Sequence, residues 1–489
     1  MIKKWVYLII LLGIAWFLYP FGRVVFFFVN DPIPKESLIP LDNTSINDAS
    51  LLNKTQHKSI IRLVPNLNKS VTLLQKILKE AKANGHKVIP FGTRHSMGKQ
   101  SLCENALHVD FAALDQMKME GDLLRVQSGA RWYQVLQYLG PLGLSVGVMQ
   151  SNADFSVGGT LSVNAHGWQP HQPPVASSVE KISVLTADGQ LYMCSRETNH
   201  ELFRHVIGGY GLFGLIIEAW IKPVPNHLLT SRHVIIEASE FDDKWNEIKK
   251  EKAALAFGRL SVAPSTFFEQ ILLVSYTSEG RIIENTPTYS IQPQSSWARA
   301  VFRSSLNSTR GKELRHFIEK TLGGEASGTF ARSDLLIEPV RVFANNQKGK
   351  VDILMEVFIP QEKLTAFLST VRPQLKNQSG PLLNVTIREI CKDKDTALPY
   401  AKTNVFGLVF LFTIDKTPKA ENEIIKISEV LFRTAIKNGG TFYLPYRNYA
   451  AIKLLKTAYP EIDKFLETKT KWDPSHLFNS GFWQYLKNQ

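Results

Sequence analysis

The stretch Val88–Gln100 (VIPFGTRHSMGKQ) constrains the fold of this 489-residue chain more than any other. A short apolar segment runs into a turn that carries Gly92 and Gly98, with His95 between them. Glycine permits positive φ and close approach of the backbone, so the consecutive amides of this turn could hold a phosphate or pyrophosphate. His95 would then lie beside the bound group. Such a turn is more often an ordinary loop with a solvated histidine. Whether it is a binding site is therefore judged from the motifs that follow it in the sequence.

The segment before the turn predicts a β-α-β unit. Ser59–Val64 has the pattern of a strand, and Ser70 is placed to N-cap an amphipathic helix that ends at Gly85. Lys87–Phe91 forms the next strand and leads directly into the glycine turn. The turn therefore belongs to a folded α/β unit.

Two more glycine motifs follow in order. Phe155–Gly167 (FSVGGTLSVNAHG) combines a glycine pair, hydroxyl groups and a second histidine, and Asn199–Ile217 contains GGYGLFG. Gly209–Gly214 has the G-x-G-x-x-G spacing of a dinucleotide fingerprint, which requires a strand before it and a helix after it. Here the helix predicted at Asn199–Ile207 comes before, and the strand predicted at Leu215–Lys222 comes after. This order excludes a Rossmann site.

Together, the three motifs resemble the FAD-binding domain of the PCMH-type flavoproteins, the vanillyl-alcohol oxidase superfamily. Alditol and xylitol oxidases, aldonolactone oxidases and cytokinin dehydrogenases are nearest in motif. The resemblance implies an α+β fold in which a two-subdomain FAD-binding domain occupies residues 59–226. An antiparallel-sheet substrate or cap domain would occupy residues 227–440, with Glu284–Arg310 as a loop. Residues 441–489, similar to the closing Asp-Pro-x-x-x-Phe element of the family, would return to the FAD domain.

The resemblance also implies where FAD binds. His95 matches the histidine that many relatives bond to the flavin 8α-methyl, which implies an 8α-histidyl FAD with a raised potential. The first motif would hold the pyrophosphate, the second the ribityl chain and flavin edge, and the third the adenine side. The other residues assigned in this way are Phe91, Gly92, Thr93, Arg94, Ser96, Gln100, Gly158, Gly159, Thr160, Ser162, Asn164, His166, Gly167, Gly211, Gly214, Ile217 and Asn479.

Candidate catalytic residues come from the second half of the chain. Leu382–Ile390 alternates apolar and polar side chains, so Asn384, Thr386 and Arg388 would share a face that could lie against the flavin. Arg388 matches an arginine that alditol oxidases place near substrate, but Thr386 replaces their glutamate and their His-Trp-Gly-Lys stretch is absent. A salt bridge from Arg388 to Glu356 is the structural alternative. The candidates for the catalytic base are Glu356, Tyr446 and Tyr449.

The first thirty residues predict a membrane anchor. Lys3 and Lys4 precede an uncharged apolar run, Trp5–Gly22, which is long enough to cross about 30 Å of hydrocarbon as a helix. No small-residue cleavage site follows, so residues 1–30 are interpreted as an uncleaved single-pass helix, with a buried or an interfacial helix as alternatives. The two lysines favour a cytoplasmic N terminus, while the side of the catalytic body stays open. Residues 31–58 would be a linker.

Composition narrows the class of partner. With 57 Lys+Arg against 44 Asp+Glu the formal charge is +13, which suits anionic surfaces or substrates, but no nucleic-acid module is recognisable. Three widely spaced cysteines exclude a disulfide framework and a CxxC metal site. His166 and His171 lack the ligand spacing of a metal hydrolase, so no metal site is predicted.

These observations and the resemblance predict an FAD-linked oxidoreductase, either an oxidase or a dehydrogenase. It would oxidise a CH–OH group of a small sugar-, polyol- or lactone-like molecule by hydride transfer to flavin N5, with a CH–NH group as the alternative. Oxygen or a quinone-like molecule would be the acceptor. One alternative is a membrane-anchored flavin-dependent C=C reductase of a lipid or sterol-like substrate. Another is a noncatalytic flavin-fold binding protein.

Overall fold

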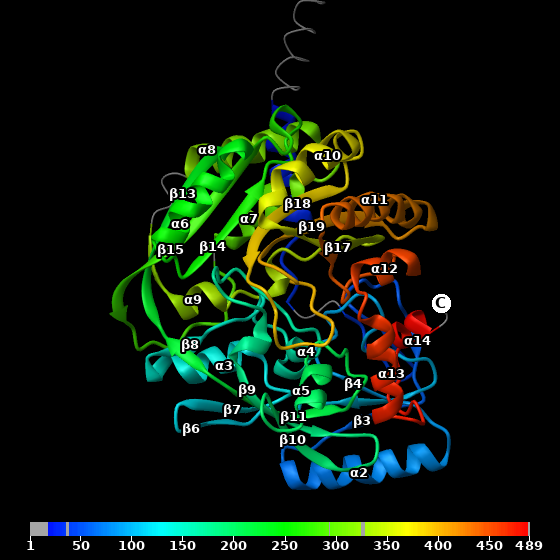
Figure 1. Ribbon diagram of the computed structural model, residues 1–489. Coiled ribbons are helices and arrows are strands. Elements are labelled where there is room, and N and C mark those ends of the chain that lie inside the picture. The colour runs from blue at the N-terminus through cyan, green and yellow to red at the C-terminus, as the bar shows by residue number, and fades with distance from the viewer. Residues whose placement is uncertain (1–17, 36–38, 293, 324–327, 488–489) are drawn as a thin grey trace, which may run out of the picture.

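The computed structural model describes residues 18–35, 39–292, 294–323 and 328–487 of the chain. One large antiparallel sheet occupies the upper half of the molecule in Figure 1, and two smaller sheets form the lower half. The chain builds the lower half first, then the large sheet, and finally returns to the lower half through its C-terminal helices (Figure 1).

The first lower sheet is parallel, with strand order β3-β5-β4. The predicted β-α-β unit is confirmed, because α2 connects β3 to β4. The predicted N-cap is wrong: Asn66 accepts the hydrogen bond from the amide of Lys69, while the Ser70 hydroxyl bonds to the backbone of Val64. The elements are β3 (Ser59–Arg62), α2 (Leu67–Ala83), β4 (Val88–Phe91) and β5 (Leu107–Asp110).

The second lower sheet is antiparallel, with strand order β10-β9-β11-β7-β6. Helix α5 precedes Gly209–Gly214 and strand β11 follows it, so the order that excluded a Rossmann site is confirmed. The elements are β6 (Met117–Glu120), β7 (Leu123–Gln127), α3 (Trp132–Leu139), α4 (Val157–Ser162), β9 (Val179–Leu185), β10 (Leu191–Ser195), α5 (His200–Val206) and β11 (Leu215–Ile221). Beside this sheet, β8 (Leu144–Val146) pairs with β12 (Pro223–Pro225).

The large sheet has strand order β16-β13-β15-β14-β18-β19-β17-β20, and every neighbouring pair is antiparallel. The predicted antiparallel cap sheet is therefore confirmed. Its strands are β13 (His227–Glu237), β14 (Leu255–Leu260), β15 (Gln270–Ile282), β16 (Thr329–Ala331), β17 (Lys350–Pro360), β18 (Leu382–Ile390), β19 (Val405–Asp415) and β20 (Thr441–Phe442).

The two faces of this sheet have different partners. Glu356 of β17 and Thr386 of β18 both pair with Val409 of β19, so their side chains share one face. Phe406 lies on the opposite face of β19, where its ring contacts Phe241 and Trp245 of α6 (Phe241–Lys250). Helices α10 (Leu364–Lys376) and α11 (Pro418–Lys437) also pack against β17. The face that carries Glu356 and Thr386 is therefore available to a ligand.

Among the described residues between β15 and β17 lie the α-helices α7 (Ser295–Ser304), α8 (Thr309–Gly323) and α9 (Arg332–Leu336). The expectation of a loop at Glu284–Arg310 is wrong for α7. The buried face of α7 carries Arg299 and Arg303, each 1% exposed, so no apolar helical period is visible in the sequence.

No helix in the described part of the chain is long and apolar enough to cross a membrane. Most of the predicted span, Trp5–Gly22, lies outside the described residues; of the predicted anchor, residues 18–30 are described, and they are helical. Val24 and Phe27 of this segment are buried against Ala300 of α7. Its opposite side exposes Leu18, Val25, Phe26 and Val29.

Residues 39–58, which we expected to be part of a linker, are folded against the lower half. Strand β1 (Ser45–Ile46) pairs with β2 (Thr55–Gln56). The fully buried Asp48 carboxylate accepts hydrogen bonds from Ser50 and Asn53. This order comes from polar side chains bonded locally, which leaves no apolar periodicity in the sequence.

The C-terminal segment returns to the parallel sheet, as predicted. Phe478 forms a parallel bridge with Val88 at the start of β4. The Asp473 carboxylate accepts from the amides of Leu477 and Phe478 and forms a buried ion pair with Lys469. The helices of this segment are α12 (Ile452–Ala458), α13 (Ile462–Trp472) and α14 (Gly481–Lys487).

Candidate active site

A cavity of about 1530 Å³ lies between the two lower sheets and the open face of the large sheet. Pockets for a single small molecule or cofactor measure about 300–1000 Å³. The cavity therefore has room for an extended cofactor and a second molecule. Every predicted residue of the first motif lines it, from Phe91 through Ser96 and including Gln100.

The glycine turn is wedged between two other segments. A Cβ on Gly92 would lie 2.0 Å from the Oγ of Ser156, the residue that caps α4. On its other side, Gln100 accepts from the amide of Gly98 at 2.9 Å and donates to the carbonyl of Leu444 at 2.7 Å. The turn can approach α4 this closely only because position 92 is glycine.

His95 lies half-buried at the cavity, with its ring stacked on Phe155 at a centroid distance of 4.2 Å. Burial is the main cause that lowers the pKa of His95, to about 4; Asp154 opposes this shift, and Arg131 and Arg94 add to it. The imidazole is therefore neutral at neutral pH and keeps a lone pair for bonding.

The second motif divides into a cavity-lining part and a supporting part. Gly158, Gly159, Ser162 and His166 line the cavity, whereas Thr160, Asn164 and Gly167 do not. The Thr160 hydroxyl lies between Trp132 Nε1 and Gln150 Oε1, at 2.8 Å from each. Asn164 donates to Asp393 at 2.9 Å. Both side chains support the motif from the side that faces away from the cavity. We had predicted that they would lie beside the cofactor.

The third motif divides in the same way. Gly211 and Gly214 line the cavity. Ile217 does not, because its side chain packs in the apolar core beside Leu185 and Leu215. Asn479, which we expected to reach the flavin, accepts a weak hydrogen bond from the thiol of Cys103 instead.

Two buried ionisable groups from different halves of the molecule meet in the cavity. The Nε2 of His166 lies 2.7 Å from Oε1 of Glu356, and the two side chains are 4% and 1% exposed. Tyr446 hydrogen-bonds to Glu356, and burial together with the negative Glu356 raises the pKa of the phenol. Tyr446 is therefore a protonated donor at neutral pH. Its neighbour Tyr449 lies outside the cavity and bonds to Arg447 and Glu421.

Arg388 also lines the cavity, and its charge faces Glu356 and Tyr446. Burial lowers the pKa of Arg388, but a guanidinium stays charged in proteins. Among the described residues no ion pair joins Arg388 to Glu356, and the buried Arg388 Nε has no hydrogen-bond partner. The predicted polar face of β18 is confirmed, because Asn384, Thr386 and Arg388 all line the cavity.

Further buried polar atoms along the cavity lack partners among the described residues: Ser101 Oγ, Ser128 Oγ and Trp168 Nε1. Buried polar groups in native proteins are almost always hydrogen-bonded, so these atoms indicate a polar ligand. FAD fits this requirement, since its phosphates, ribityl hydroxyls and flavin ring supply both donors and acceptors. Within the described residues, no cluster of His, Cys, Asp or Glu is placed to hold a metal ion.

Sequence reasoning missed a second polar cluster in the same cavity. Glu319 of α8 accepts from Arg315 at 2.8 Å and from Arg259 of β14 at 3.0 Å, and Arg315 also donates to Asn384 at 3.0 Å. The two arginines hold the pKa of Glu319 down to about 2, against its burial. The i, i+4 spacing of Arg315 and Glu319 is equally typical of a solvated helix face, so the sequence contains no distinguishing signal.

Comparison with known proteins agrees with the geometry of the lower half. Residues 67–195 match the family model of an FAD binding domain. Cytokinin dehydrogenase 2 of Arabidopsis thaliana is 29% identical over 192 residues, which are 37% of this chain and 38% of that protein. D-arabinono-1,4-lactone oxidase of Debaryomyces hansenii is 24% identical over 195 residues, and that of Saccharomyces cerevisiae 23% over 186 residues. Each of these two matches covers 37% of this chain and 35% of the relative, so the similarity spans about a third of either protein.

Proposed function

We propose that this chain, in which residues 67–195 form an FAD-binding domain of the PCMH type, is an FAD-dependent oxidoreductase that oxidises a CH–OH group. One observation carries the proposal: the glycine turn with His95 and the buried His166–Glu356 pair line a single cavity. The names of the similar proteins, a lactone oxidase and a cytokinin dehydrogenase, support an oxidoreductase.

The lower half would hold the cofactor. Residues Gly92–Ser96 line the cavity, and their amides would carry the pyrophosphate. Gly158, Gly159 and Ser162 would lie along the ribityl chain. When bound, FAD supplies a two-electron acceptor at N5. The neutral imidazole of His95 is suited to a covalent bond with the flavin 8α carbon, because only the unprotonated nitrogen is a nucleophile.

Glu356 and His166 would take the substrate proton. Nδ1 of His166 contacts the carbonyl of Gly167 at 3.2 Å, so this nitrogen carries a hydrogen. Nε2 lies 2.7 Å from Oε1 of Glu356, but the two atoms are not aligned as a hydrogen bond, and Oε1 has no hydrogen-bond partner among the described residues. The carboxylate has further lone pairs with which to accept the hydroxyl proton as hydride leaves the same carbon.

Arg388 and Tyr446 would position the reacting groups. The unpartnered Nε of Arg388 can donate to the substrate oxygen and hold it beside Glu356. Tyr446 donates to Glu356 and fixes the orientation of the carboxylate. Such positioning supplies a large part of the rate in reactions of this kind.

The direct test is anaerobic reduction of the bound flavin by a panel of polyols, sugars and lactones. Bleaching of the visible flavin band by a CH–OH donor, followed by recovery with oxygen or a quinone, would support the proposal. Reduction by NADPH alone would instead support a C=C reductase. Colourless protein that does not take up FAD would contradict both.

Membrane attachment through the N-terminal segment is part of the proposal. The exposed apolar side chains of residues 18–30 favour it. Alkaline carbonate extraction of cell membranes is the test: retention of the full-length chain in the pellet would support attachment, and release into the supernatant would contradict it.

A further inference from the structure

The lining of the cavity extends from the catalytic groups to residues of α7 and α8, and we call the part beside these two helices the second compartment. Along β18, Arg388, Thr386 and Asn384 line one face, a path of about 13 Å at the rise of an extended strand. Asn384 then bonds to Arg315 of α8, whose guanidinium lies 4.8 Å from the ring centroid of Phe302 on α7. The catalytic end of the cavity is therefore joined, contact by contact, to helices α7 and α8.

The side chains that line this second compartment are mainly apolar. The apolar ones are Ala298, Val301, Phe302, Ile318, Val342 and Phe343, and the exposed Gln292 and Gln294 also line the cavity. Hydroxyl groups of a sugar or polyol would find few partners here, and a buried hydroxyl without a hydrogen bond is costly. An alkyl or isoprenoid chain has no such cost and gains free energy from burial.

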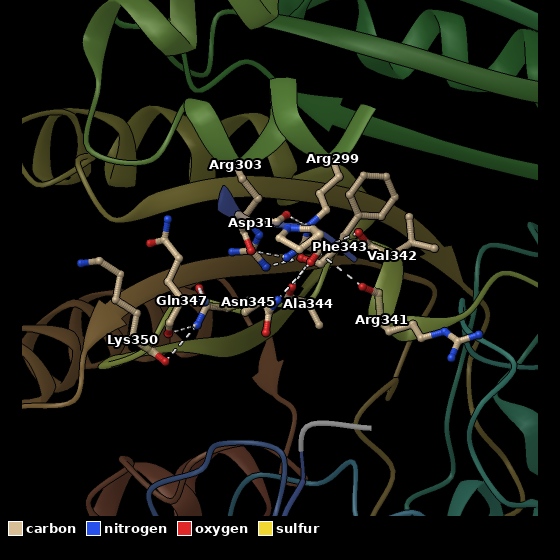
Figure 2. A network of polar contacts seen from close by, with 12 residues as sticks. Asp31, Arg299, Arg303, Arg341, Val342, Phe343, Ala344, Asn345, Gln347 and Lys350 are labelled. Carbon is tan, nitrogen blue, oxygen red and sulfur yellow. Dashed lines mark hydrogen bonds and ion pairs between the residues drawn. The ribbon is translucent and has the colours of Figure 1, made fainter. Parts of the chain in front are cut away.

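Buried arginines fix the wall of the compartment. Arg299 of α7 donates to the carbonyls of Val342 and Ala344 at 2.9 and 2.7 Å, and pairs with Asp31 at 2.7 Å (Figure 2). Arg303 bonds to the carboxylate of Asp352. It also donates to the carbonyl of Phe343 (Figure 2). The side chains of Val342 and Phe343 are thus held in place against the cavity, and the same contacts tie the compartment to the N-terminal segment.

The compartment opens beside an exposed apolar surface. Trp297 and Ala298 line the cavity and are exposed, and the Trp297 ring stacks on Phe28 at 4.2 Å. Phe28 belongs to the helix of residues 18–30, on which Val25 and Val29 are 55% and 67% exposed. A chain that leaves the cavity at Trp297 would therefore meet apolar surface before it met water.

We propose that the substrate is an amphipathic alcohol: its CH–OH head lies beside Glu356 and Arg388, and its long apolar chain fills the compartment between α7 and α8. The position of the head rests on the proposed function; the binding of the chain does not. The polar cluster of Arg259, Arg315 and Glu319 marks the boundary between the two parts.

Photolabelling of the full-length FAD-loaded protein with a diazirine analogue of hexadecanol tests the proposal without a need for turnover. We expect label on α7 and α8, mapped by mass spectrometry, and competition by hexadecanol but not by butanol. Ile318→Gln should lower this labelling at least about fivefold, because it places an amide in the apolar compartment. The matched control is Phe317→Gln, whose side chain is 63% exposed and outside the cavity, and it should stay within about twofold.

Label confined to residues 18–30 and other exposed surface, or equal labelling of the two variants, would overturn the proposal. Ala298→Trp gives a second reading, because it narrows the mouth from an exposed position and should also reduce internal labelling. The flavin spectrum, recorded on each variant, separates the binding of the apolar chain from the oxidation of the alcohol. Labelling of α7 and α8 without reduction of the flavin would support the first and contradict the second. Reduction of the flavin without this labelling would do the opposite.

Discussion

The Nε2 of His166, from the FAD-binding domain, lies 2.7 Å from the Oε1 of Glu356, on strand β17 of the large sheet. Both residues are buried. The pair therefore joins the two halves of the molecule at the point where cofactor and substrate would meet.

Removal of the Glu356 carboxylate should reduce flavin reduction strongly. We expect Glu356→Gln to lower the rate by roughly 10²–10⁴-fold, the usual contribution of a positioned base. FAD binding should persist, since the glycine turn is untouched. The control is Glu389→Gln, which alters a buried carboxylate outside the cavity and should leave the rate per flavin unchanged. Equal losses in stopped-flow reduction for both variants would exclude Glu356 as the base.

Replacement of His95 should change how the cofactor is held. In the unaltered protein, flavin colour should stay with the pellet after acid precipitation; in His95→Ala it should move to the supernatant. His171→Ala is the control, since His171 does not line the cavity. Colour retained in the pellet by His95→Ala would show that another residue bears the bond.

Gly92→Ala should prevent normal FAD binding. Its Cβ would lie 2.0 Å from Ser156 Oγ, so the turn or α4 must move. We expect a flavin-to-protein ratio at least about tenfold lower than that of the unaltered protein, measured after exhaustive desalting with FAD present throughout expression. Gly22→Ala, which meets no atom within 4 Å, should keep its full flavin content.

The buried ion pair between Asp31 and Arg299 should contribute to stability. Arg299→Met leaves the Asp31 carboxylate and the carbonyls of Val342 and Ala344 without a donor. Loss of one partner of a buried pair costs about 3–5 kcal/mol. Chemical denaturation should therefore show a clearly lowered midpoint. An exposed pair gives the comparison: Lys464→Met, which removes the contact with Glu467, should change the midpoint little.

Lys312 should make stability depend on pH. Burial, followed by repulsion from Arg315, lowers its pKa to about 7 from the ordinary 10.5, and its ammonium bonds only to the carbonyls of Ser379 and Gly380 among the described residues. At a pH between these two pKa values, Lys312 is neutral in the folded state and takes up a proton on unfolding. The free energy of unfolding therefore rises with pH in this range. Lys312→Met should lose this part of the rise in urea denaturation. A slope identical to that of the unaltered protein would contradict the shift, and Lys76→Met, on an exposed side chain, is the control.

The sequence predicted the side of the cavity formed by the glycine motifs better than the side formed by the large sheet and its helices. Local rules suffice for the β-α-β unit, because the turn at Gly92 follows a strand with a clear apolar pattern. The alternation of β18 likewise indicated that Asn384, Thr386 and Arg388 share a face. Both signals arise from neighbours in the sequence, where periodicity is visible.

Contacts between distant segments were not predictable. His166 and Glu356 are 190 positions apart, and no periodicity links them. We predicted a loop where α7 lies, because the buried residues of this helix are Arg299 and Arg303 rather than apolar side chains. Their partners are backbone carbonyls and acidic residues that lie far away in the sequence. Thr160, Asn164, Ile217 and Asn479 were assigned to the cofactor by motif position alone, whereas their side chains support the motifs from behind.

Anaerobic titration of the purified full-length protein with CH–OH donors, followed through the visible flavin band, tests the central claim most directly. The account predicts that at least one such donor bleaches the band, that the band returns on addition of an electron acceptor, and that Glu356→Gln keeps the band but resists bleaching. FAD-loaded protein that no CH–OH donor reduces, or whose Glu356→Gln variant bleaches as fast as the unaltered protein, would contradict it.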